Sequence, residues 1–293
     1  MSKLDLKGIY PALITPFTQD NKVNESSLRA IVNMNIQKGV KGFYVDGSTG
    51  EAFMLSIEER KRILEIVSDE NKGRVKIIAH IGCISTDQAI DLGMHARALG
   101  VDAVSAVPPF YYKFSFNEIA QHYFSIADAV QLPLIVYNIP SFSGVELTPE
   151  NIKALRKNPY IAGIKHTSMN LYQLERMHAA DEDLLIFNGH DEVFLAGLSM
   201  GAMGAIGSTY NFMAEKFLLI EKLFREHNTD EALRIQAEAN QVINAIIQTG
   251  VLAGTKYIMK KKYDIDCGSC RSPFQPLSEE DQLMLDDVIE RYL

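Results

Sequence analysis

The sequence has few cysteines and no long apolar run at its start. Three cysteines in 293 residues are too few for the disulfide framework of a secreted chain, and a chain of this length can bury a stabilising core without them. The segment MSKLDLKGIY at residues 1–10 contains no apolar run of signal-peptide length. Because nothing requires an oxidising compartment, we expect a cytoplasmic protein.

Positive charge is also scarce. The chain has 29 lysine and arginine residues against 37 aspartate and glutamate residues, a formal net charge of -8, which argues against a nucleic acid or an anionic membrane as the main partner. Residues 193–214 carry no formal charge and could reach across a bilayer, but glycine and hydroxyl residues recur within them, which favours a short helix, a buried strand and a loop. We therefore expect a small-molecule partner and no membrane span.

What the sequence does contain is a regular alternation of two patterns. Short apolar runs alternate with segments in which apolar residues recur at helical spacing, as in parallel β/α units. Capping-box spacings at Ser56, Ser85 and Ser115 mark three helix starts, and no GxGxxG follows the first run. Eight runs in about 210 residues predict an α/β fold, the (β/α)8 TIM barrel. The expected strands are residues 9–14, 42–46, 76–81, 103–107, 134–138, 162–165, 184–187 and 202–206.

Helical patterns alone follow residue 211, and no Pro-, Gly- or Ser-rich linker precedes them. We expect residues 1–225 to form the barrel with the active site and residues 226–293 to form a helical C-terminal extension packed on it. Cys267 and Cys270 form a CxxC motif there, but without a preceding strand or a second pair neither a redox nor a zinc site is expected. The helical segments are 214–226, 230–248, 251–262 and 278–292.

Lys165 ends one of the apolar runs, and barrel enzymes carry their active sites at the carboxyl ends of the strands. The period of two along a strand places Lys165 and Thr167 on one face and His166 on the other. If that face is buried, the uncharged amine is favoured, and such a lysine can attack a carbonyl group to form a Schiff base. A surface or ion-paired lysine is the alternative.

The segment GSTGE at 47–51 follows the second expected strand. Its glycines let the backbone aim N–H groups at an anion, and Ser48 and Thr49 add hydroxyl donors. The spacing of a P-loop is absent, so a carboxylate fits better than a nucleotide phosphate. An ordinary polar turn is the alternative.

Tyrosines follow two further runs. Tyr137 ends the run at 134–136, and its phenol could transfer a proton, although a packing role is the alternative. Tyr111 and Tyr112 follow the segment PPF at 108–110, and adjacent aromatic residues also suit a subunit interface.

Motifs that surround these residues are distributed along the chain: GSTGE at 47–51, PFYY at 109–112, YNIP at 137–140, GIK at 163–165, GHDE at 189–192 and GAIGSTYN at 204–211. Together they resemble the N-acetylneuraminate lyase family, within the dihydrodipicolinate synthase superfamily, over essentially the whole chain. The resemblance implies a class I aldolase, usually a homotetramer. Such an enzyme cleaves N-acetylneuraminate (sialic acid) to pyruvate and N-acetylmannosamine through a lysine imine, with no metal or other cofactor.

The resemblance also implies a role for each matched residue. Lys165 corresponds to the imine-forming lysine and Tyr137 to the tyrosine that transfers a proton. Ser48 and Thr49 correspond to the residues that bind the pyruvate carboxylate, and Ser48 also links Tyr137 to Tyr111, which the family supplies to a neighbouring active site. The positions that correspond to binders of the hydroxylated part of the substrate are Thr167, Gly189, Asp191, Glu192 and Ser208.

Position 142 favours this subfamily over its relatives. Dihydrodipicolinate synthases have an arginine two residues after the proline of their Tyr-Asn-x-Pro motif, where this chain has Phe142. Without the guanidinium group a second carboxylate is poorly recognised, whereas Asp191 and Glu192 offer acceptors for sugar hydroxyl groups. The departures from the family pattern, which concern substrate preference, are Asp46, Pro108 and His166.

Three alternatives remain open at this point. A dihydrodipicolinate synthase-like or other 2-keto acid aldolase would use the same lysine, and a sugar-acid-binding regulatory protein could keep the barrel without catalysis. A metal-dependent aldolase could use His80 and His190 with Asp191 and Glu192, but these residues lack HExxH spacing and we expect His80 to be a buried barrel residue.

Overall fold

Eight parallel strands form a single closed sheet in the computed structural model, which describes residues 5–293. Residues 1–4, at the start of the segment in which no signal peptide is expected, lie outside the described residues. Each strand pairs with its neighbours in sequence order, and β1 pairs with β8. The ring closes where Ala12 bridges Tyr44, between the ends of β1 and β2. The strands are β1 Gly8–Pro11, β2 Gly42–Val45, β3 Lys76–His80, β4 Ala103–Ala106, β5 Leu134–Asn138, β6 Ile161–His166, β7 Leu185–Asn188 and β8 Gly204–Gly207.

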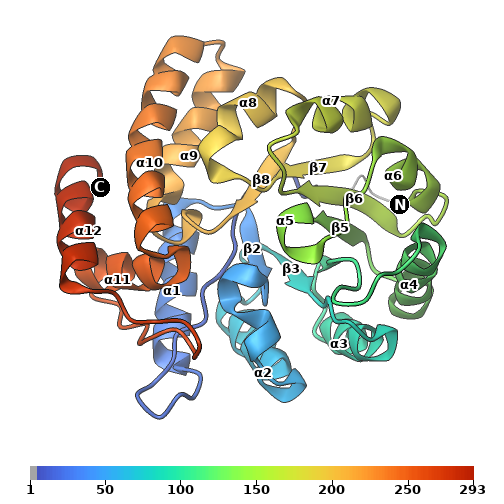
Figure 1. Cartoon of the computed structure of the whole chain (residues 1–293), viewed down its shortest axis with the longest axis horizontal. Coiled ribbons are helices and arrows are strands. Elements are labelled where there is room, and N and C mark those ends of the chain that lie inside the picture. Colours follow the sequence, from blue (N-terminus) through green and yellow to red (C-terminus); the bar gives the residue numbers. More distant parts are fainter. Residues whose placement is uncertain (1–4) are drawn as a thin grey trace.

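Helices surround this sheet (Figure 1), so the predicted TIM barrel is confirmed. The capping boxes form at Ser56 and Ser115, as predicted, whereas Ser85 caps its helix without a side-chain hydrogen bond. The helices are α1 Glu25–Lys38, α2 Ile57–Asn71, α3 Thr86–Ala98, α4 Phe116–Val130, α5 Pro140–Ser143, α6 Pro149–Leu155, α7 Leu171–Ala180, α8 Phe194–Ser199, α9 Tyr210–Arg225, α10 Thr229–Thr249, α11 Val251–Tyr263 and α12 Glu279–Tyr292.

The first strand is shorter than predicted because a side chain, instead of a neighbouring strand, accepts a hydrogen bond from its backbone. The first strand was expected at 9–14 but ends at Pro11, because Ile14 N donates to the side-chain Oδ1 of Asn211 at 3.3 Å. The uncharged stretch 193–214 forms α8, β8 and the start of α9. Within residues 5–293 we find no helix that is long and apolar enough to cross a membrane.

Below the carboxyl ends of the strands, the interior of the barrel is filled with side chains. Tyr10, Tyr44 and Phe187 point inward and are fully buried, and the rings of Tyr10 and Phe187 meet edge to face with centroids 5.7 Å apart. The interior is therefore a core rather than a pore, and the open space for a ligand lies above it, at the carboxyl ends of the strands.

The last three helices lie together on one side of the barrel, next to α9 and α1 (Figure 1). α10 also reaches the loop after β7: Gln236 accepts a hydrogen bond from Leu195 N at 3.1 Å, and its amide donates to Asp191 O at 3.1 Å. α10 thus contacts the segment that follows the carboxyl end of β7.

Candidate active site

Lys165 lies at the carboxyl end of β6 and is only 4% exposed. Its Nζ lies 4.0 Å from the centroid of the Tyr137 ring and 4.5 Å from that of the Tyr44 ring. The register of the sheet pairs Tyr137 directly with Lys165. Within residues 5–293 no acidic side chain forms an ion pair with Lys165, and its amine faces the two aromatic rings.

His166 points to the other side of the same strand. Its Nδ1 lies 3.2 Å from Asn138 Nδ2, and its Nε2 lies 3.1 Å from Asn170 O, so the neutral ring accepts from the amide and donates to the carbonyl. Burial lowers the pKa of His166, which favours this neutral form. His166 thus links the end of β6 to β5 and to the loop before α7. The prediction that Lys165 and His166 point to opposite faces of the strand is confirmed.

The β2 loop, residues 47–55, forms two short 3-10 turns, Ser48–Gly50 and Ala52–Met54. Thr49 Oγ1 lies 2.8 Å from Ser208 Oγ, so the loops after β2 and β8 meet at a shared pair of hydroxyl groups. Thr15 Oγ1 donates to Gly50 O at 2.7 Å and so links the first of these turns to the segment after β1. Three predicted residues are therefore brought to one side of the barrel mouth: Ser48, Thr49 and Ser208.

Asp191 is buried, and its carboxylate is hydrogen-bonded to Thr209 in the loop after β8. Its Oδ2 accepts from the N–H of Thr209 at 3.0 Å and from the hydroxyl of Thr209 at 2.7 Å. Burial raises the pKa of Asp191. Its Oδ1 has no hydrogen-bond partner in the described part of the chain and lies where a Cβ on Gly207 would be, 1.7 Å away. Glycine at 207 is thus required for this carboxylate to lie against β8.

Glu192 differs from its neighbour because it is half-buried and paired. Its Oε1 lies 3.1 Å from His190 Nδ1. Burial opposes ionisation of Glu192, but the hydrogen bonds from His190 and from its own backbone N–H outweigh burial and lower the pKa.

Thr167 packs closely against Gly189. A Cβ on Gly189 would lie 1.9 Å from Thr167 Oγ1. This buried hydroxyl has no hydrogen-bond partner among the described residues.

Tyr111 lies away from the other predicted residues. It is 84% exposed, has a φ of 77°, and its ring meets that of Tyr112 edge to face at 5.1 Å. Among residues 5–293, no hydrogen bond joins the side chains of Ser48, Tyr137 and Tyr111. Tyr111 therefore does not complete the site of its own chain.

A cavity of about 290 Å³ adjoins Ser48 at the barrel mouth. Its walls are mainly apolar and include Phe53, Phe110, Phe142 and Leu252. Phe142 is 75% exposed, so the position at which dihydrodipicolinate synthases place arginine presents an aromatic ring to this mouth. Such walls suit a less polar part of a ligand.

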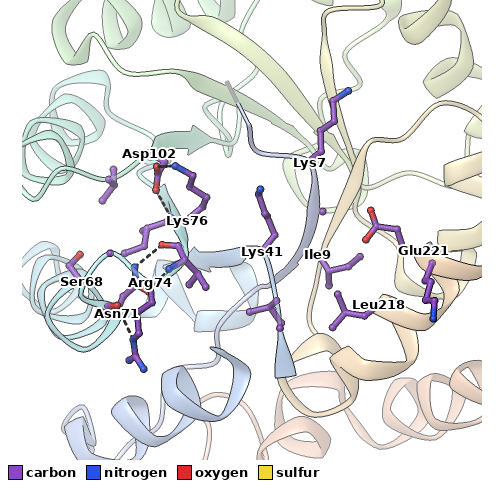
Figure 2. Close-up of a pocket in the computed structure, with 18 of the residues that line it drawn as sticks. Lys7, Ile9, Lys41, Ser68, Asn71, Arg74, Lys76, Asp102, Leu218 and Glu221 are labelled. Carbon is purple, nitrogen blue, oxygen red and sulfur yellow. Dashed lines mark hydrogen bonds and ion pairs between the residues drawn. The ribbon is translucent and has the colours of Figure 1, made fainter. Parts of the chain in front are cut away.

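A larger cavity, of about 890 Å³, opens at the opposite end of the barrel (Figure 2). Lys7, Lys41 and Lys76 line it, and Lys76 is neutralised by Asp102 at 2.7 Å. None of the predicted site residues lies there. Parallel barrels carry their chemistry at the carboxyl ends of the strands. The candidate active site is therefore at that end, where Lys165 ends β6 and Ser48 lines the smaller cavity.

Sequence reasoning missed Tyr44, which forms one wall beside Lys165. Its hydroxyl donates to Ser105 Oγ at 3.0 Å, and Ser105 donates to Ile135 O at 2.8 Å. Burial raises the pKa of Tyr44, so its hydroxyl stays protonated. The period of two along 42–46, which puts residues 42, 44 and 46 on one face, was the signal that could have identified it.

The residues considered for a metal site do not gather. His80 Nδ1 lies 2.8 Å from Asp46 O, inside the barrel wall, whereas His190 pairs with Glu192. In the part of the chain that the structure describes, no group of three or more His, Cys, Asp or Glu residues has the arrangement of a metal site. His80 is the buried barrel residue that we predicted, although its Nε2 has no hydrogen-bond partner among the described residues. Burial holds its pKa well below the usual range.

Asp46, one of the departures from the family pattern, gives a prediction for stability. It is buried with a φ of 59°, and burial raises the pKa of its carboxyl to about 7, against the opposing charge of Arg60. Between about pH 4 and pH 7 only the folded chain holds this proton, so the free energy of unfolding falls as the pH rises, by up to about 4 kcal/mol. Above pH 7 this contribution is constant.

Asp46→Asn removes this titration and keeps a side chain that tolerates the left-handed conformation. We expect the variant to exceed the wild type in free energy of unfolding by about 1 to 4 kcal/mol at pH 8 and by much less at pH 4, measured by urea denaturation at both pH values. Asp264→Asn is the matched control, since Asp264 is also left-handed but its side chain is 89% exposed. An equal gain at both pH values would contradict the assignment.

Comparisons with known proteins agree with this geometry. A model of the Dihydrodipicolinate synthetase family matches residues 5–292. The N-acetylneuraminate lyase of Shigella boydii serotype 4 (strain Sb227) is 46% identical over 277 residues, which cover 94% of this chain and 93% of that protein.

Two solved structures extend the comparison to three dimensions. CdNal from Clostridium difficile in complex with mannosamine has a TM-score of 0.96 at 39% identity and covers 99% of this chain and 100% of that one. N-acetylneuraminate lyase from Fusobacterium nucleatum complexed with pyruvate has a TM-score of 0.93 at 39% identity, over 98% and 97% of the two chains. The resemblance indicated by the motifs is confirmed, and the chain belongs to the dihydrodipicolinate synthetase family.

Proposed function

We propose that this chain is an N-acetylneuraminate lyase, a class I aldolase that cleaves N-acetylneuraminate to pyruvate and N-acetylmannosamine. The observation that carries the proposal is the buried amine of Lys165, held between the rings of Tyr137 and Tyr44 at the barrel mouth. The names and the extent of similarity of the Shigella boydii and Fusobacterium nucleatum proteins support the same activity.

The proposed reaction begins when Lys165 Nζ attacks the ketone carbon C2 of the open-chain substrate and water leaves. The protonated imine then accepts the electron pair of the C3–C4 bond as that bond breaks, while a base removes the proton from the C4 oxygen. The ring faces of Tyr137 and Tyr44 stabilise the positive charge of the imine. Protonation at C3 and hydrolysis of the imine release pyruvate, and no step requires a metal or other cofactor.

The other site residues fit the two ends of this substrate. We assign Tyr137 as the group that accepts the C4 hydroxyl proton, because its ring adjoins the amine. Ser48 and Thr49 bind the carboxylate next to C2 through the short turn that they share. The residues assigned to the hydroxylated part of the substrate are Thr167, Gly189, Asp191, Glu192 and Ser208.

The exposure of Tyr111 supports a subunit interface. Tyr111 and Tyr112 are 84% and 64% exposed, and large aromatic side chains at the surface favour protein–protein contact. We propose a homotetramer in which Tyr111 of one subunit reaches the Ser48 and Tyr137 of a neighbour. The small molecules that we assign as partners are N-acetylneuraminate, pyruvate and N-acetylmannosamine.

Borohydride trapping tests the proposed function. We expect sodium borohydride to reduce a pyruvate imine to a stable adduct that peptide mapping locates on Lys165, and the same enzyme to cleave N-acetylneuraminate. Condensation of pyruvate with aspartate semialdehyde is the matched comparison, and Phe142 leaves that substrate without a guanidinium partner. No adduct on Lys165, or faster condensation than cleavage, would overturn the proposal.

A further inference from the structure

Glu51 ends the GSTGE motif, and its side chain is held by an ion pair in the protein interior. The residue has a φ of 59° and joins the two turns of the β2 loop. Its carboxylate is fully buried: Oε1 accepts from Lys256 Nζ at 2.6 Å and Oε2 accepts from Arg271 N at 2.8 Å. Both partners belong to the C-terminal part of the chain, 205 and 220 residues away.

Lys256 lies on α11, and its side chain is only 3% exposed. Besides Glu51, its ammonium donates to Ser269 O at 3.1 Å and lies 4.4 Å from the centroid of the Phe17 ring. Three groups therefore surround this charge: a carboxylate, a carbonyl and an aromatic ring. Because a buried charge is stable only when it is compensated, loss of Lys256 would leave the Glu51 carboxylate without a counter-charge, with only the Arg271 N–H bond remaining of the two that we describe.

The position of Glu51 sets that of the residues before it. Glu51 N donates to Ser48 O at 3.1 Å, and this bond closes the turn that contains Ser48 and Thr49. We propose that Lys256 is a positioning residue, whose ion pair with Glu51 holds the β2 loop in the conformation that presents Ser48 and Thr49 to the substrate carboxylate. The inference rests on the proposed function.

The contacts of Arg271 allow the ion pair between Lys256 and Glu51 to be tested separately from the packing of the C-terminal segment. Its guanidinium group bonds to the Glu59 carboxylate and donates to Met54 O at 2.9 Å, independently of Lys256. In a Lys256→Met variant these contacts still fasten the C-terminal segment over the loop. The change therefore removes the charge opposite Glu51 without releasing the segment that covers it.

The experiment compares two ketones in borohydride trapping at Lys165. Pyruvate carries the carboxylate that the β2 loop binds, whereas acetone lacks it. For Lys256→Met we expect the pyruvate concentration that gives half-maximal trapping to rise at least about tenfold, with the acetone dependence unchanged within about twofold, because a small displacement of a binding group is costly only to the ligand that uses it.

Lys38→Met is the matched control. Lys38 is likewise largely buried and donates to Phe212 O at 3.0 Å and to Tyr263 O–H at 2.6 Å, but it has no contact with the β2 loop. Its variant should change neither ketone dependence. If Lys256→Met does not fold, Glu51→Gln, which keeps the size of the side chain and an acceptor for Arg271 N, should show the same selective rise.

The outcomes separate the inference from the proposed function. An equal loss with pyruvate and acetone, or an unchanged pyruvate dependence in a folded variant, overturns the role of Lys256 and leaves the aldolase in place. A wild-type enzyme that traps no pyruvate on Lys165 overturns both.

Discussion

Lys165→Ala is expected to abolish turnover, lowering kcat by roughly 10⁴-fold or more. The imine is the electron sink for the C3–C4 bond, and no other group in the site can take its place. His166, the next residue, points away from the site and is bonded to Asn138 and Asn170. The measurement is the initial rate of pyruvate release from N-acetylneuraminate. Activity within tenfold of the wild type would contradict the assignment.

The same variant should remain folded. Lys165 forms no ion pair within residues 5–293, so its removal leaves no buried charge without a partner. It lies at the barrel mouth, where water can replace the side chain. Circular dichroism and thermal denaturation should match the wild type closely. Lys165→Arg is a matched control, because it keeps a cation near the Tyr137 ring but cannot form an imine; it too should be inactive.

The pair of Lys165 and Tyr137 shows what the sequence could predict. Each residue ends an apolar run, consecutive strands of a parallel barrel are neighbours, and the register indeed pairs the two residues. Hydrophobic periodicity placed both residues at strand ends, whereas the association of the amine with the phenol was implied only by the family resemblance. The same reasoning placed His166 on the opposite face.

Contacts between distant segments could not be predicted in this way. The buried pair of Glu51 and Lys256 joins the β2 loop to α11, and neither local pattern indicates the other. Asp191 was expected to bind substrate hydroxyl groups, but its Oδ2 is taken by Thr209, which depends on how the loop after β7 packs on β8. Such bonds depend on tertiary packing and on side-chain rotamers, which sequence periodicity does not encode.

The two ends of the barrel also differ in a way that the sequence did not indicate. The larger cavity lies at the amino ends of the strands, where Lys41 is paired with Asp5 and Lys76 with Asp102. At the other end Lys165 has aromatic neighbours instead of carboxylates. The chemistry of the neighbours, rather than the size of the cavity, therefore favours Lys165 over Lys41 and Lys76 as the proposed imine-forming residue.

Tyr137→Phe is expected to lower kcat by about 10²-fold to 10⁴-fold, the usual contribution of a proton-transfer group. The pyruvate concentration for half-maximal trapping should change much less. The reason is geometric: phenylalanine keeps the ring that lies 4.0 Å from Lys165 Nζ, so the imine still forms beside the same aromatic face. Only the hydroxyl group, to which we assign removal of the proton from the C4 oxygen, is lost. Steady-state cleavage and borohydride trapping measure the two effects separately.

Tyr10→Phe is the matched control for this change. Tyr10 is fully buried in the same barrel, and its hydroxyl has no hydrogen-bond partner in the described part of the chain. Its removal should leave cleavage unchanged, because the ring still packs against Phe187 and the lost group lies below the site. Equal losses of kcat and pyruvate trapping in Tyr137→Phe would show that the phenol orients the keto acid instead of accepting a proton, and the base would then have to be the carboxylate of the substrate itself.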